Sequence, residues 1–231
     1  MKMEDKANLP RVRIAVLGHV NVGKSALTVR YLTRRFIGEY RSNTDLLYRQ
    51  TVPLDSGLLD VEIVDVSAEI ENDFPIEQIQ WADACLIVYS ITDRESYKYA
   101  TRALANMKSI QTSTSSYLIA NKVDLDHLRE VAETEGASLA ASHGIGFCEV
   151  SVADNSPSLY KAFERLLNDS RGRPVKQRKF SVSKMIGTLI GNNDHKPIQL
   201  TQGTMVPCCK GELHKSRVLK RRQGFTATAS L

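Results

Sequence analysis

Apolar positions recur with two different periods between residues 11 and 168. Short β-branched or continuous apolar runs predict buried strands, whereas apolar positions at intervals of three and four predict amphipathic helices. The expected strands are 12–17, 47–54, 58–64, 85–89, 117–120 and 147–150, and the expected helices are 24–35, 94–110, 130–141 and 158–167. Because strands alternate with helices, we expect an α/β domain with a six-stranded, mostly parallel sheet and helices on both faces.

Three details of this pattern predict local structure. The strands 47–54 and 58–64 are separated by a three-residue Asp-Ser-Gly turn, which favours an antiparallel hairpin. Pro53 has no backbone N–H to donate, so the first of these strands is expected at an edge of the sheet. Asp93 is expected to cap the N-terminus of the helix that follows it.

The periodicity ends near residue 170 and divides the chain into three parts. We expect a flexible N-terminus at 1–10, the α/β domain at 11–170 and a largely disordered basic tail at 171–231. Residues 170–231 hold 13 of the 31 Lys and Arg but only 2 of the 26 Asp and Glu, a net charge of +11. The preceding residues carry −6, so the charge of the chain is divided between an acidic domain and a basic tail.

A basic tail favours an anionic partner, which can be lipid headgroups, nucleic acid or an acidic protein surface. Residues 215–222 contain five Lys and Arg, a density typical of a membrane-surface patch, a nuclear-import cluster or a solvated run. We expect an anionic membrane surface and no specific nucleic acid; the alternative is a solvated tail without a dedicated partner.

No run of about 18 apolar residues predicts a membrane-spanning helix. Four cysteines are too few for a disulfide framework, and Cys85 and Cys148 are expected to be reduced core residues.

The segment GHVNVGKS matches the phosphate-binding pattern G-x-x-x-x-G-K-[ST] between a predicted strand and a predicted helix. Its glycines allow the backbone close to phosphate oxygens, and the helix N-terminus presents free N–H groups. Lys24 is expected to reach the β- and γ-phosphates, and Ser25 to offer its hydroxyl to Mg²⁺. The residues expected to contact the nucleotide here are Gly18, His19, Val20, Asn21, Val22, Gly23, Lys24, Ser25 and Ala26.

The tetrapeptide Asn121-Lys122-Val123-Asp124 follows directly after the strand 117–120. Open α/β sheets bind ligands beyond the carboxyl ends of their strands, so this segment shares an edge with the phosphate loop. The Asp124 carboxylate can accept from the N1–H and the 2-amino group of guanine, a donor pair that adenine lacks. The Lys122 stem can lie along the base plane. The expected ligand is therefore GTP or GDP.

These motifs, together with RRFIGEY (34–40), Asp65, WADACLIVYSITDRESY (81–97) and EVSVA (149–153), resemble the small GTPases of the Ras superfamily over about residues 11–168. Within the superfamily, LTVRYLTRRFIGEY and VYSITDRESY most resemble the Ras-like branch of the estrogen-regulated growth inhibitor type. The resemblance implies a P-loop NTPase fold, a monomeric GTPase that acts as a signalling switch, and GTP or GDP with Mg²⁺ as cofactors. It also implies effector and regulator proteins that bind through 37–48 and 65–80.

The resemblance assigns roles to further residues. Phe36 is expected to stack on the guanine, with a core aromatic as the alternative. Asp65 is expected to hold Mg²⁺ through a water. The loop that supports the base is expected at Ser151, Val152 and Ala153.

Several positions depart from the pattern of the family. Val20 replaces a small residue near the γ-phosphate, Ala68 replaces a glycine, and Glu69 replaces the glutamine that orients the attacking water. Glu69 and Lys24 are the catalytic candidates, and these departures together predict slow GTP hydrolysis. The alternatives are an ordinary rate with a different loop geometry, and a GTP-binding scaffold that barely responds to the nucleotide.

The Mg²⁺ ligand of the first switch is normally a threonine. Alignment places Asn43 there with Thr44 beside it, and either oxygen can ligate a hard cation.

The last residues of the sequence are Thr-Ala-Ser-Leu, without the C-a-a-X pattern, so we expect no prenylation. Cys208 and Cys209 are either S-acylated or an exposed pair of little consequence. We expect a cytoplasmic protein, with the inner face of the plasma membrane and the nucleus as further locations.

Overall fold

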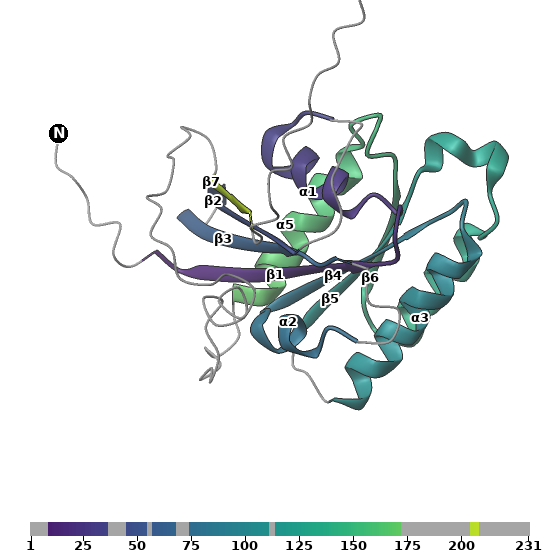
Figure 1. The fold of residues 1–231 in the computed structure, drawn as a ribbon, viewed down its shortest axis with the longest axis horizontal. Helices are drawn as coiled ribbons and strands as arrows, with labels where there is room; N and C mark the ends of the chain where they lie inside the picture. Colours follow the sequence, from purple (N-terminus) through teal and green to yellow (C-terminus); the bar gives the residue numbers. More distant parts are fainter. Residues whose placement is uncertain are drawn as a thin grey trace, which may run out of the picture.

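The computed structural model describes residues 9–36, 45–54, 57–67, 74–110, 114–171 and 204–207. Its elements follow one another in the order that the sequence predicts, with three additions (Figure 1). They are β1 (Arg11–Gly18), α1 (Lys24–Thr33), β2 (Leu46–Leu54), β3 (Gly57–Asp65), α2 (Ile76–Trp81), β4 (Ala84–Ser90), α3 (Arg94–Ser109), β5 (Ser115–Asn121), the 3₁₀ helix η2 (Val123–Leu128), α4 (Glu133–Ser142), β6 (Gly146–Val150), α5 (Pro157–Arg171) and β7 (Thr204–Pro207). The helix α2, the helix η2 and the strand β7 are the additions.

The strands form one sheet in the order β6-β5-β4-β1-β3-β2-β7. The strands β6, β5, β4, β1 and β3 are parallel to one another. The strand β2 pairs antiparallel with β3, which confirms the predicted hairpin. The six predicted strands and the mostly parallel sheet are therefore confirmed. The short β7, from the segment that we expected to be largely disordered, adds a seventh strand that pairs antiparallel with Leu46–Arg49 of β2. Pro53 lies beyond this pairing, on the part of β2 that has no second neighbour among the described residues.

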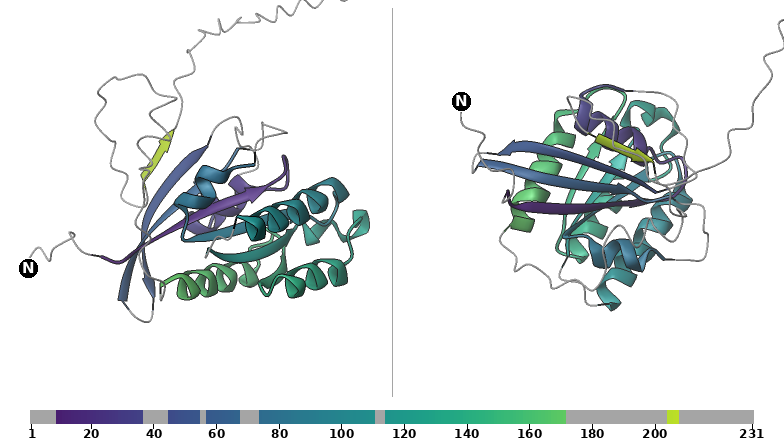
Figure 2. Two further views of the ribbon diagram at one scale, coloured as in Figure 1. Left: turned by 90° about the horizontal axis from the view of Figure 1, so that it is seen from below. Right: turned by 60° about the vertical axis from the view of Figure 1, so that its left-hand side comes forward.

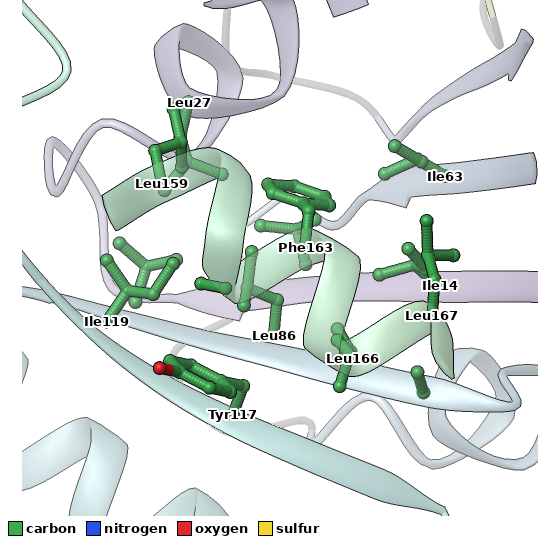
Figure 3. Close-up of a cluster of buried hydrophobic side chains, with 14 of the residues drawn as sticks. Ile14, Leu27, Ile63, Leu86, Tyr117, Ile119, Leu159, Phe163, Leu166 and Leu167 are labelled. Carbon is green, nitrogen blue, oxygen red and sulfur yellow. The ribbon is translucent and has the colours of Figure 1, made fainter. Parts of the chain in front are cut away.

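Helices cover both faces of the sheet, with α1 and α5 on one side and α2 and α3 on the other (Figures 1 and 2). Beneath α5, Leu159, Phe163, Leu166 and Leu167 point onto the sheet (Figure 3), at the spacing that its amphipathic sequence predicts. The other face buries the apolar residues of α2, α3 and α4 in a second cluster. Because β6, β5, β4, β1 and β3 run parallel, their carboxyl ends lie at one edge of the sheet.

The structure tests the predicted helix cap and the predicted core cysteines. Asp93 caps α3 by accepting hydrogen bonds from the N–H groups of Glu95 and Ser96, as predicted. Cys85 is buried, and Cys148 is half-buried and packs against the core, which agrees with the prediction that both lie in the core. None of the helices in the described residues is both long and apolar enough to cross a membrane.

Candidate functional site

The motifs that carry chemistry converge at the carboxyl ends of parallel strands. Gly18 ends β1, Asp65 ends β3 and Asn121 ends β5, and these strands lie near one another in the sheet. The loop at 151–153 follows β6, the neighbour of β5. The structure therefore places the phosphate loop and the base-reading segment on one edge, where open α/β sheets bind ligands.

Two glycines of the phosphate loop stand where no side chain fits. A Cβ atom at Gly18 would lie 2.4 Å from the carbonyl oxygen of Val88 on β4. Gly23, directly before α1, has φ 94°, and a Cβ atom there would lie 2.5 Å from Asn121 Nδ2. The loop backbone is therefore packed closely against the sheet and against the base-reading segment, with the N-terminus of α1 at its end.

Lys24 is buried, and its Nζ donates to the carbonyl oxygen of His19 at 3.0 Å. Burial lowers the pKa of Lys24, whereas the nearby carboxylates of Asp65 and Asp45 act in the opposite direction. The ammonium group is thus held by the loop itself, at the position that the motif predicts for the phosphates.

Ser25 and Asp65 form the part of the site that suits a cation. Ser25 Oγ donates to Asp65 Oδ2, while the buried Oδ1 of Asp65 has no hydrogen-bond partner. Burial raises the pKa of Asp65 to about 6, against the opposing effects of the Ser25 hydrogen bond and the Lys24 charge. A hydroxyl beside a carboxylate with an unpartnered oxygen matches the hard oxygen donors that Mg²⁺ prefers, so these residues fit that ion.

Asn121 connects the phosphate side of the site with the base side. Its Nδ2 donates to the carbonyl oxygen of Val22 at 2.9 Å, and its Oδ1 accepts from the N–H of Val152 at 3.2 Å. Lys122 follows with φ 70°, and this left-handed residue starts the 3₁₀ helix that carries Asp124. Asp124 is exposed, so its carboxylate is available to a base at this edge.

Phe36 is 47% exposed, which favours the predicted role at the nucleotide over the alternative of a core aromatic. The ring lies against a residue that sequence analysis did not single out, since Arg30 Cζ is 5.7 Å from its centroid. Arg30 also donates to the carbonyl oxygens of Val152 and Ala153. The signal for Arg30 was its position on the buried stripe of α1, three residues after Leu27.

The loop at 151–153 is ordered by its own contacts as well. Ser151 is buried, and its Oγ accepts from the N–H of Asp154 at 3.0 Å. The side chain of Ser151 therefore shapes the loop from within.

The catalytic candidate Glu69, together with Ala68, Asn43 and Thr44, lies outside the described residues. The structure does describe the residues that flank them. Asp45 Oδ1 accepts from the N–H of Ser67 at 2.7 Å, and its Oδ2 accepts from Gln78 Nε2 at 2.9 Å. Asp45 therefore connects the segment that precedes β2 with the segment that follows β3 and with α2. Val20 is 39% exposed on the phosphate loop.

Comparisons with known proteins agree with this geometry. The profile of the Ras family matches residues 13–171. The Ras-related and estrogen-regulated growth inhibitor-like protein of Bos taurus is 37% identical over 192 residues, which cover 78% of this chain and 94% of the relative. The Ras-like protein family member 11B of Bos taurus is 36% identical over 182 residues, covering 72% of this chain and 73% of the relative. The profile match contains the phosphate loop, Asp65, Asn121 and the loop at 151–153.

Proposed function

Because the chain belongs to the Ras family, in the branch of the estrogen-regulated growth inhibitor type, we propose that it is a Mg²⁺-dependent guanine-nucleotide switch that hydrolyses GTP slowly. Membership of the family makes the chain a GTP-binding small GTPase; the dependence on Mg²⁺, the slow rate and the signalling role are the proposal. The observation that carries the guanine-nucleotide site is the bridge by Asn121, which joins the phosphate loop at Val22 and the base loop at Val152 through one side chain.

Different residues of the site bind the phosphates, the Mg²⁺ ion and the base. Lys24 and the free N–H groups at the start of α1 meet the negative charge of the phosphates. Ser25 and Asp65 would hold Mg²⁺, which when bound neutralises charge on the β- and γ-phosphate oxygens. The Asp124 carboxylate accepts from the N1–H and the 2-amino group of guanine. Asn121 fixes the phosphate loop and the base loop relative to each other. Binding energy thus comes from phosphate charge, and selectivity comes from the base.

We attribute the slow rate to three residues that differ from the pattern of the family at positions expected beside the attacking water and the γ-phosphate. The exposed, β-branched Val20 stands where an arginine from a second protein would approach, a contribution worth about 10³–10⁵ in rate. Glu69 can accept from the attacking water but cannot donate to the phosphoryl group, and its charge adds to that of the phosphates. Ala68 has less backbone freedom than glycine.

Nucleotide-dependent switching needs an element that reads the γ-phosphate. The segments 37–48 and 65–80 are the candidates for this element, and Asp45 connects their described parts through Ser67 and Gln78. Effectors and regulators are proposed to bind there. The basic tail is proposed to keep the protein at anionic membrane surfaces from the cytoplasm.

A single-turnover assay tests the proposed rate. Wild type and the triple variant V20G/A68G/E69Q are loaded with GTP, and hydrolysis is started with Mg²⁺. We expect the triple variant to hydrolyse GTP faster, and the single variants to change little because these positions act as a unit. GDP affinity, measured in parallel, shows that each variant retains its site. A triple variant that binds GTP but is no faster would contradict the proposed cause of slow hydrolysis and favour the scaffold alternative.

A further inference from the structure

We propose that Arg30 is a positioning residue that holds the base loop, residues 151–153, and thereby sets how long a guanine nucleotide stays bound. This inference rests on the proposed function, because it concerns the same site. Arg30 lies on α1, which otherwise faces the phosphate side and the core. It reaches across the fold to a loop that is about 120 residues away in the sequence.

The geometry is that of a fork on two adjacent carbonyl groups. Arg30 Nε donates to the oxygen of Val152 at 2.8 Å, and Nη2 donates to the oxygen of Ala153 at 2.5 Å. The residue is only 8% exposed, so water does not compete effectively for these donors. A planar guanidinium presents these donors in a fixed fork that spans two carbonyl groups, whereas the three donors of a lysine share one nitrogen at the end of a flexible stem.

The third nitrogen of Arg30 ties the same side chain to the end of its own helix. Nη1 donates to the carbonyl oxygen of Arg34 at 3.2 Å, at the C-terminus of α1. The guanidinium also lies 5.7 Å from the ring of Phe36, which is expected to stack on the base. One side chain therefore contacts the base loop and the expected stacking residue, and it belongs to the helix whose N-terminus faces the phosphates.

The charge of Arg30 has an unusual environment. Within the described part of the chain, no carboxylate lies at salt-bridge distance from it, and its partners are carbonyl oxygens and a ring. A buried cation is costly unless it is well hydrogen-bonded, so these carbonyls are held firmly in place by the need to solvate it. Asn121 fixes the same loop from the other side, through the N–H of Val152.

Nucleotide release requires the base to leave this loop, so loosening the loop should raise the release rate. Removing Arg30 leaves the two carbonyls of the base loop without their charged donor. If about half of the energy of one charged hydrogen bond appears in the barrier to release, the rate rises about tenfold. A lysine should give an intermediate rate because it keeps the charge but lacks the fixed fork of the guanidinium.

The matched control is Arg34, four residues further along the same helix. Its guanidinium lies 3.6 Å from the ring centroid of Tyr160 on α5, and no hydrogen bond joins its side chain to the described part of the base loop. Arg34→Ala removes the same mass and charge at the same end of α1, and it leaves the Arg34 carbonyl in place. A general loosening of the helix would affect both variants.

The experiment measures the release of a fluorescent GDP analogue from full-length wild type, R30A, R30K and R34A, with excess GDP and constant Mg²⁺. Thermal unfolding of each protein is recorded alongside. We expect release about tenfold faster from R30A, an intermediate rate from R30K and a rate close to wild type from R34A. Equal release from R30A and wild type, or equal acceleration in R30A and R34A, would overturn the role of Arg30. A wild type that binds no GDP analogue would instead contradict the proposed function itself.

Discussion

The side chain of Asn121 donates to the carbonyl oxygen of Val22 at 2.9 Å, although 99 residues separate them in the sequence. The same side chain accepts from the N–H of Val152, so a single buried amide joins two loops at the edge of the sheet. Gly23 is required beside it, because a Cβ there would come within 2.5 Å of the amide nitrogen. The phosphate loop and the base-reading segment therefore form one structural unit.

Asn121→Ala should destabilise the protein and weaken nucleotide binding together. The substitution leaves the carbonyl of Val22 and the N–H of Val152 buried without partners, at a cost of about 2–4 kcal/mol. Urea unfolding and GDP titration measure the two effects. Asn106→Ala, at an exposed position of α3, is the control and should change neither. An Asn121→Ala protein with an unchanged free energy of unfolding would show that the bridge is not important for stability.

Removal of Mg²⁺ should accelerate GDP release by at least about tenfold, the equivalent of 1.4 kcal/mol. The reason is that Ser25 and Asp65 would then no longer share a cation with the phosphates. Release of a fluorescent GDP analogue is followed with and without EDTA.

In Asp65→Asn the effect of EDTA should be much smaller, because the carboxylate charge that is expected to hold Mg²⁺ is gone. Asp60→Asn, on the same strand, is the matched control, since its Oδ1 accepts from Thr51 and an Asn oxygen can replace it. The assignment of Asp65 would be wrong if EDTA accelerated release equally in both variants.

The tail should bind anionic vesicles weakly and reversibly. Each Lys or Arg near an anionic bilayer contributes about 1 kcal/mol, so the five in 215–222 supply about 5 kcal/mol before entropic costs. Sedimentation with vesicles that contain phosphatidylserine should pull down the full chain at low salt and release it at high salt. Vesicles of phosphatidylcholine alone, and a chain with these five residues changed to Gln, are the controls.

Binding that persists at high salt and is lost after Cys208→Ser and Cys209→Ser would indicate acylation instead of charge. A chain that fails to bind at low salt would exclude the membrane surface as a partner of the tail.

The sequence predicted most of the fold because strong periodic signals govern it. The continuous apolar run of β4, the antiparallel pairing of β2 with β3 and the Asp93 cap were all predicted and are all observed. The short α2 was missed because six residues show no helical period, although Ile79 and Trp81 are buried. The strand β7 was missed because its sequence, within the basic tail, shows no alternation of apolar and polar residues. Its pairing depends on β2, which is far away in the sequence.

The site was predicted in its motifs but not in its connections. A motif specifies residues within a few positions of one another, so Lys24, Ser25 and Asp124 could be assigned from the sequence. The double role of Asn121 and the fork of Arg30 depend on loops that come together only in the folded chain. A charged residue on the apolar stripe of α1 was the one signal that pointed to Arg30.

Guanine selectivity is the central claim, and equilibrium binding of GDP and ADP to wild type and Asp124→Asn tests it most directly. Wild type should prefer GDP by at least about a hundredfold, because only guanine offers two donors to the carboxylate. Asp124→Asn should lose about 30- to 1,000-fold in GDP affinity, or about 2–4 kcal/mol, and should gain affinity for the diphosphate of xanthosine, whose base has a carbonyl in place of the amino group. Asp126→Asn, two residues along the same 3₁₀ helix, is the control and should behave as wild type. Equal affinities of wild type for GDP and ADP, or an unchanged GDP affinity in Asp124→Asn, would contradict the account.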